Sequence, residues 1–192
     1  IIMSKLETNT IDTVSGTTNL TIGSTNSSTV TFESGAVTGH MYPAFSVSMS
    51  ANQTITENAT VLVEFDVEDF DSDSAFNNTG TGNGYSFTVP SGKAGKYYIF
   101  TQAIISSGAV SNLEFTQLSI FVNGSVHGRA SHDERDNEAL SSGLFRGVIL
   151  DLSDGDYIQV YARCGTSNSS DPSVNSGSGR KDTIFGGYRI GT

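Results

Sequence analysis

The run from Gly95 to Ile105 constrains the fold more than any other stretch of this sequence. It reads GKYYIFTQAII and follows a turn-forming segment, Pro90 to Ala94. Aromatic and β-branched residues favour strands, and here they occupy both parities of the run, so a strand would have no solvated face. One face can lie in the core of a two-sheet sandwich, which buries one face of every strand.

The second face of this strand needs another cover, because a single sandwich normally leaves its outer face polar. Its apolar residues are Tyr98 and Phe100. We therefore expect these two side chains to contact another subunit. The alternative is a central strand that a loop of the same chain covers.

The composition favours an all-β protein. The 192 residues include 21 Gly and only three Pro, and 36% of them are hydrophobic. Short alternating runs separated by turn residues are typical of strands. We expect about ten strands in the larger part of the chain, a number that suits a jelly roll. Their expected ranges are 44–49, 52–55, 60–65, 85–89, 95–105, 113–122, 125–127, 144–152, 156–162 and 183–190. We expect loops in the acidic segment 66–73, the charged segment 131–138 and the Ser/Asn/Gly-rich segment 165–179.

Residues 1–40 differ in composition from the rest of the chain. They are poor in aromatics and rich in Thr, Ser, Asn and Gly. Three short alternating runs, at 10–14, 19–22 and 29–32, are too short to be stable alone. We expect a β-rich N-terminal arm or shaft that trimerisation or an attachment site orders, followed by a head at 41–192. The alternative is a flexible polar linker.

The charge and the apolar content exclude some classes of partner. A net charge of −10 argues against nucleic acid, which needs clustered Lys and Arg. No apolar stretch is long enough to span a bilayer.

We expect no signal peptide, because polar sequence follows Met3. Met3 looks like a natural start, and Ile1 and Ile2 before it are unexplained. Cys164 is the only cysteine, so we expect no intrachain disulfide and a semi-buried thiol.

Six short motifs occur in an order known from one family. They are Phe45-Ser46-Val47, Val63-Glu64-Phe65-Asp66, Tyr85-Ser86-Phe87-Thr88-Val89-Pro90, Gly95-Lys96-Tyr97-Tyr98-Ile99-Phe100, Leu152-Ser153-Asp154-Gly155-Asp156 and Phe185-Gly186-Gly187-Tyr188. In this order the sequence resembles the globular head of the first complement component's q subunit, itself similar to the tumour-necrosis-factor jelly roll. The resemblance covers roughly residues 43–191.

That resemblance implies a ten-stranded jelly-roll sandwich, an obligate homotrimer and binding without catalysis. It also implies that Tyr97, Ile99 and Phe185 lie in the core. Seven positions would face the threefold axis: Tyr98, Phe100, Gln102, Phe145, Ile184, Tyr188 and Ile190.

The chain departs from the family at its N-terminus, which lacks collagen-like Gly-X-Y triplets. The arm instead resembles the Thr/Ser/Gly-rich N-terminal regions of bacteriophage appendage proteins. We therefore expect a virion structural protein on the particle surface, tail fibre-like or capsid-decorating, assembled in the host cytoplasm. Its expected partners are its own copies, other virion proteins and a host surface receptor. The alternative is a bacterial surface or secreted adhesin with the same trimeric head.

Candidate chemistry is sparse. Asp69, Asp71 and Asp73 have the spacing at the start of a calcium loop, but the sixth position is Ser74 and the twelfth is Gly80, so they do not form an EF-hand. Calcium is the cofactor this cluster could hold; the alternative is a solvated turn. Adjacent residues such as Ser131-His132-Asp133 cannot converge as a catalytic triad, so we expect no enzyme activity.

Receptor recognition is expected in loops, which vary without disturbing a rigid sandwich. Polar side chains in the segments 77–84, 131–137 and 167–179 suit hydrogen bonding to glycans, although they also suit any solvated loop. The candidate residues are Asn77, Asn83, His132, Asp133, Arg135, Asn168 and Asp171.

Overall fold

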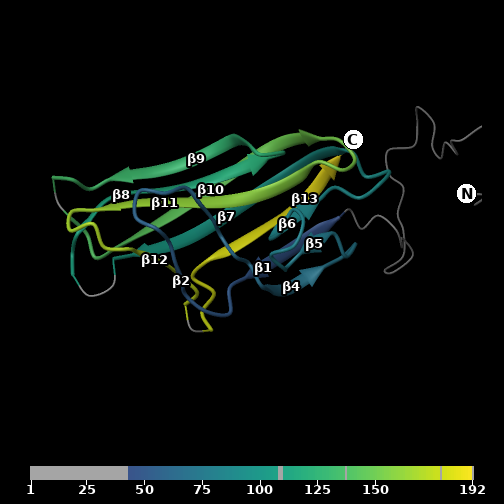
Figure 1. Ribbon diagram of the computed structural model, residues 1–192. Helices are drawn as coiled ribbons and strands as arrows, with labels where there is room; N and C mark the ends of the chain where they lie inside the picture. Colours follow the sequence, from purple (N-terminus) through teal and green to yellow (C-terminus); the bar gives the residue numbers. More distant parts are fainter. Residues whose placement is uncertain (1–42, 108–109, 137, 178, 192) are drawn as a thin grey trace, which may run out of the picture. The chain divides into compact units, whose positions relative to one another are not determined.

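The protein is a two-layer β-sandwich in the computed structural model, which describes residues 43–107, 110–136, 138–177 and 179–191 (Figure 1). These residues form thirteen strands and no helix, and ten of the strands have three or more residues. Eight of these ten overlap the predicted strand ranges. No described segment is therefore a helix that could cross a membrane. The N-terminal arm lies outside the described residues, so the division at residue 40 stays a prediction.

One layer, sheet A, is centred on β7. Its strands in order are β2 (Gln53–Thr54), β12 (Ser173–Asn175), β7 (Gly95–Ser106), β13 (Ile184–Gly191), β1 (Ala44–Ser48) and β4 (Val67–Asp71), and β10 (Ser141–Leu152) pairs with β7. All the pairings are antiparallel. Strand β7 holds β10 along its whole length and holds β12 and β13 as well.

The other layer, sheet B, packs face to face on sheet A. Its strands in order are β5 (Phe76–Asn77), β6 (Ser86–Thr88), β11 (Tyr157–Thr166), β8 (Leu113–Val122) and β9 (Ser125–Asp133), with β3 (Val61–Leu62) also paired to β11. The turn between β8 and β9 is the expected Asn-Gly hairpin, since Asn123 and Gly124 have φ values of 50° and 76°.

The core between the sheets is rich in aromatic rings. Phe45 of β1 stacks on Phe87 of β6 at 4.4 Å between ring centroids, and Phe185 of β13 meets Phe45 edge-on at 5.0 Å. Tyr97 and Ile99 of β7 are fully buried beside them, so the predicted core positions are confirmed. Truncating such a ring to alanine typically costs about 3–5 kcal/mol.

Three expected loops contain strands. Within the acidic segment, β4 pairs with β1 through Phe70 opposite Ser46 and Val67 opposite Ser48. Residues 131–133 of the charged segment extend β9, and β12 lies in the Ser/Asn/Gly-rich segment. These polar strands form because long neighbouring strands offer unpaired backbone groups. The expected strand at 60–65 is shorter, and β5 was not expected.

Asp154 fixes the turn that leads into β7. Its carboxylate accepts backbone N–H bonds from Gly92 at 2.7 Å, Lys93 at 3.1 Å and Ala94 at 2.8 Å. These bonds, that from Gly92 first, hold the pKa of the Asp154 carboxyl below its ordinary value of 3.8. The contact ties the turn after β10 to the turn before β7.

These three hydrogen bonds to Asp154, the Asp154 clamp, predict a specific loss of stability in acid. Because folding lowers the pKa of Asp154, its contribution is present above the ordinary pKa and is lost as pH falls below 3.8 through the folded value. Thermal unfolding from pH 6 to pH 3 should show a smaller acid-induced fall in Tm for Asp154→Asn than for the wild type. The exposed Asp151→Asn is the control, and an equal fall in both variants would contradict the clamp.

Cys164 is fully buried on the inner face of β11. Burial raises the pKa of its thiol to about 12, and only the thiolate reacts rapidly with disulfide reagents.

The native protein should therefore resist thiol modification. At pH 8, Ellman's reagent should react negligibly with the folded chain and release one equivalent of chromophore after denaturation in guanidinium. Rapid reaction of the folded protein would show that the thiol is open to solvent. Cys164→Ala supplies the blank.

Candidate functional site

The outer face of sheet A carries a continuous group of apolar side chains, the apolar face. It crosses β10, β7 and β13, and β7 contributes the even-numbered residues opposite to those in the core. Its members are Tyr98, Phe100, Ile104, Phe145, Ile149, Tyr188 and Ile190. The predicted second apolar face of the central strand is therefore present.

Much of the apolar face is open in the described chain. Ile149 is 65% exposed, Phe145 57%, Tyr188 47% and Ile190 43%. Tyr98 and Phe100 are half-buried by each other and by Tyr188, with ring centroids 5.7–5.8 Å apart. No described loop covers Ile149 or Phe145, so intrachain cover is not observed for these two residues.

Two glycines let the aromatic rings lie close to the sheet. A Cβ on Gly147 would come within 2.5 Å of the Tyr98 hydroxyl, and one on Gly186 would come within 2.7 Å of the Phe100 ring. Gly147 and Gly186 are also the two cross-strand partners of Phe100. The rings therefore fill the space that side chains on the neighbouring strands would take, which flattens the apolar face.

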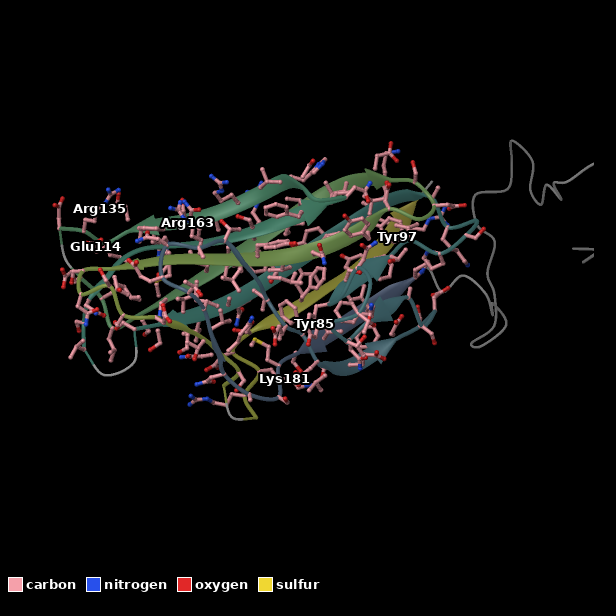
Figure 2. All side chains as sticks on the ribbon, in the orientation of Figure 1. Tyr85, Tyr97, Glu114, Arg135, Arg163 and Lys181 are labelled. Atoms are coloured by element: carbon pink, nitrogen blue, oxygen red, sulfur yellow. The ribbon has the colours of Figure 1, made fainter. Side chains whose placement is uncertain are left out.

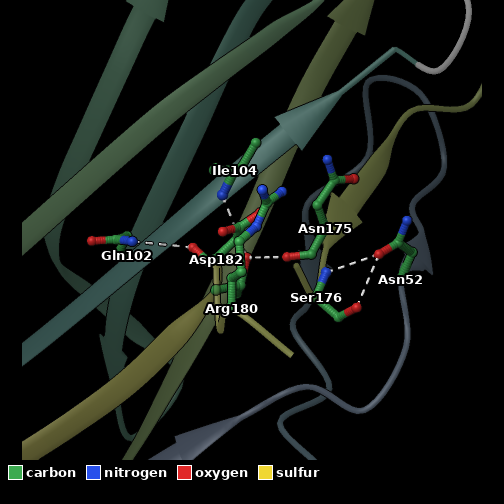
Figure 3. Close-up of polar contacts among 8 residues, drawn as sticks. Asn52, Gln102, Ile104, Asn175, Ser176, Arg180 and Asp182 are labelled. Carbon is green, nitrogen blue, oxygen red and sulfur yellow. Dashed lines mark hydrogen bonds and ion pairs between the residues drawn. The ribbon is translucent and has the colours of Figure 1, made fainter. Parts of the chain in front are cut away.

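Gln102 and Ile184 lie beside these rings. Gln102 pairs with Phe145 on one side and Ile184 on the other. Its side-chain amide donates to the carbonyl of Asp182 at 3.3 Å, and Figure 3 shows this bond in the polar turn before β13. The same turn is tied to Asn52, whose side-chain oxygen accepts from the backbone N–H of Ser176 at 2.9 Å. All seven predicted interface residues thus lie on one surface.

A second surface lies at the edge where β9 and β10 meet. Val126 there is 48% exposed, and the Nε of Arg146 is buried with no hydrogen-bond partner among the residues described. A Cβ on Gly128 would meet both Val148 and Arg146 within 2.9 Å, so the two strands approach closely at this edge. An unpaired guanidinium nitrogen is costly unless another group approaches it.

The Asp69, Asp71 and Asp73 carboxylates do not share a site. Lys181 donates to Asp69 at 2.6 Å, whereas Asp71 accepts from the backbone N–H of Phe76 at 2.7 Å. Across the described ranges, no three His, Cys, Asp or Glu side chains are arranged to hold a metal ion. The carboxylates instead connect β4 to neighbouring segments.

The predicted receptor residues separate into three groups. His132, Asp133 and Arg135 line one hollow of about 420 Å³, the distal hollow, together with Phe115, Gln117, Ser131 and Arg163. Asn168 and Asp171 follow β11, where Asp171 accepts from the backbone N–H of Glu57 at 2.9 Å. Asn77 is the last residue of β5, and Asn83 lies in the segment between β5 and β6. This part of the chain meets the other end of β11.

Sequence reasoning missed Phe115, Gln117 and Arg163. Phe115 and Gln117 lie on the outward parity of β8, and an aromatic ring at an outward position was the available signal. Arg163 comes from a strand far along the chain, and only the register of β11 on β8 places it opposite Gln117. Nothing local in the sequence gives that pairing.

Asp133 and Arg135 form an ion pair at the rim of this hollow. Arg135 donates from Nε to Asp133 Oδ1 at 2.8 Å and from Nη2 to Oδ2. The hydrogen bond from Arg135 holds the pKa of Asp133 below its ordinary value. His132 turns away from them, with its Nδ1 3.0 Å from the hydroxyl of Ser142.

Comparison with known proteins identifies the fold. No family model and no curated protein matches this sequence. The structure is similar to the tumour-necrosis-factor-like protein APRIL from mouse, solved at pH 5.0, with a TM-score of 0.55 and 10% identity over 78% of this chain and 99% of that one. It also matches the globular domain of the zebrafish complement 1qA protein, with a TM-score of 0.48 and 19% identity over 77% of this chain and 97% of that one. The likeness to APRIL confirms the predicted all-β jelly roll.

Proposed function

We propose that this chain is a non-enzymatic homotrimeric head, and the carrying observation is the open apolar face. Monomeric proteins rarely expose a contiguous apolar patch of this kind, which usually marks an interaction site. The outer side of an antiparallel sheet is otherwise polar. A second copy of the same chain is the simplest partner. Contact between copies would bury the apolar face of an otherwise polar chain of net charge −10, and no other protein would be needed.

The arrangement of the two surfaces supports a ring of three. The apolar face and the β9–β10 edge are different surfaces, so a contact between them is heterologous and forms a ring only if the rotation closes. The exposed Val126 at that edge is an apolar group that would pack on the apolar face of a neighbouring copy. The resemblance to trimeric heads is the reason that we propose three copies and not another number.

The role that we propose for this head is in a bacteriophage particle, as a tail fibre-like or capsid-decorating appendage. The support is the composition of residues 1–40, which suits an attachment arm and contains no collagen-like repeat. Pro43 supports the same arrangement, since its carbonyl accepts from the N–H of Arg189 at 3.0 Å. The described part of the chain therefore begins beside the last strand.

A charge on the apolar face should dissociate the trimer. Light scattering should give the wild type three times the 20.3 kDa mass of the chain. Ile149→Asp should lose about 2 kcal/mol or more of association free energy per subunit, because it buries an unpaired carboxylate at each interface. The substitution should leave the fold intact, since Ile149 is 65% exposed in one chain.

The matched control is Val110→Asp, which charges a residue that is 54% exposed between β7 and β8, outside both surfaces. It should remain a trimer. A monomeric wild type at micromolar concentration, or trimers of unchanged stability in Ile149→Asp, would contradict the proposal.

Deleting residues 4–40 should separate attachment from head assembly. The truncated chain should still form trimers, because the apolar face lies wholly in the head, but it should be absent from purified particles. Quantitative mass spectrometry of particles complemented with wild-type or truncated chain measures the difference. Normal incorporation of the truncated chain would refute the docking role of the arm.

A further inference from the structure

The distal hollow lies on the outer face of sheet B, at the end of the sandwich opposite Pro43, where the described chain begins. Figure 2 shows Arg135, Glu114 and Arg163 toward this end and Tyr97 toward the end where β13 finishes. The hollow of about 420 Å³ is within the range of about 300–1,000 Å³ that small-ligand sites occupy. It is separate from the apolar face, which belongs to the other sheet.

A row of three polar side chains crosses the floor of the hollow. Ser131 of β9, Gln117 of β8 and Arg163 of β11 are direct cross-strand neighbours. Such neighbours have Cβ atoms about 4.5–5.5 Å apart. The Gln117 amide and the Ser131 hydroxyl have no hydrogen-bond partner among the described residues, and Arg163 uses only its Nε, which donates to the Asn58 carbonyl at 3.0 Å. The row offers paired donors and acceptors that the protein leaves unused.

An aromatic ring lies beside this polar row. Phe115 is opposite Gly165, and a Cβ at Gly165 would clash with the Phe115 ring, so the ring lies low across the strand. The Arg163 guanidinium lies over this ring, with its carbon 5.0 Å from the ring centroid, so it covers part of the ring face. The floor therefore combines an apolar ring with planar polar groups, the combination that suits a molecule with both a C–H face and a rim of hydroxyls.

The hollow holds two cations, Arg135 and Arg163, and the carboxylates in and around it, Asp133, Glu114 and Asp136, exceed them in number. Arg135 is already paired with Asp133, so its fork is not free for a second carboxylate. Glu114 and Asp136 act electrostatically on Arg135 as well. These carboxylates and a net chain charge of −10 would repel an anionic polymer.

We infer that the distal hollow binds a neutral saccharide, one or two hexose units with vicinal hydroxyls. The C–H groups of the sugar pack against Phe115 beside the Arg163 guanidinium, and its hydroxyls exchange hydrogen bonds with Gln117, Ser131 and the terminal nitrogens of Arg163. The inference rests on the proposed role as an outward-facing head and names the class of surface molecule that the head would recognise. In a homotrimer, three such hollows would bind a repeating glycan more tightly than one does.

Saturation-transfer NMR on the full chain tests this inference. The probes are the methyl glycosides of glucose, galactose, mannose and N-acetylglucosamine, with methyl glucuronide as the acidic comparison. At least one neutral glycoside should bind with a dissociation constant of about 1–10 mM, as expected for a small polar ligand in a shallow site. Methyl glucuronide should bind at least tenfold more weakly than methyl glucoside.

Two substitutions locate the binding. Phe115→Ala and Gln117→Ala should each weaken binding at least tenfold. Phe121→Ala is the matched control because Phe121 lies on the same strand and the same sheet face but outside the hollow. Its ring packs at a tilt against Tyr161, with 4.4 Å between ring centroids. This control variant should bind within twofold of the wild type. Gln117→Ala removes only a partly exposed amide, so it tests the site even if Phe115→Ala unfolds.

Each result decides the inference. Binding by none of the neutral glycosides, equal binding by Gln117→Ala, or preferred binding of the glucuronide would overturn it. Light scattering on the same samples keeps the two proposals apart. A trimer that binds no glycoside loses only the saccharide site, whereas a monomer that binds one keeps the site and loses the proposed trimer.

Discussion

The fold depends on β7, a strand that is apolar on both sides. Tyr97, Ile99 and their odd-numbered neighbours fill the core, and this burial holds sheet A against sheet B. The even-numbered side chains have no such cover within the head, so the burial that stabilises one chain also creates a surface that favours assembly. Because β7 pairs with β10, β12 and β13, this outer surface spreads over several strands and is wide enough to be shared with another subunit.

The sequence predicts the long strands and the jelly roll well, for a clear physical reason. Strand β7 is a long run rich in aromatic and β-branched residues that alternates strictly between buried and outward positions, and Asn123-Gly124 supplies a turn whose geometry sets the hairpin register. The short polar strands β4 and β12 could not be predicted, because they exist through pairing with strands distant in sequence. The local sequence pattern reflects which side of a strand is buried, whereas the pairing of a strand at a sheet edge depends on strands that are distant in the sequence.

The candidate sites likewise contain some residues that the local sequence identifies and others that only strand pairing brings together. The residues that β7 contributes to the apolar face could be named because two-sided apolarity is a local property, whereas Phe145 followed only from the resemblance. His132, Asp133 and Arg135 were recognised as polar loop residues, yet their companions Gln117 and Arg163 come from two other strands. The grouping depends on cross-strand register, which a single sequence does not contain.

Strand β4 has a consequence for crowded copies of this protein. It is the last strand of sheet A, and its outer edge would offer free backbone groups to any passing strand. The exposed Glu68 places negative charge on this strand, and like charges on two such strands oppose sheet-to-sheet addition. The acidic segment thus protects against fibril growth, which matters most where many heads are held at high local concentration.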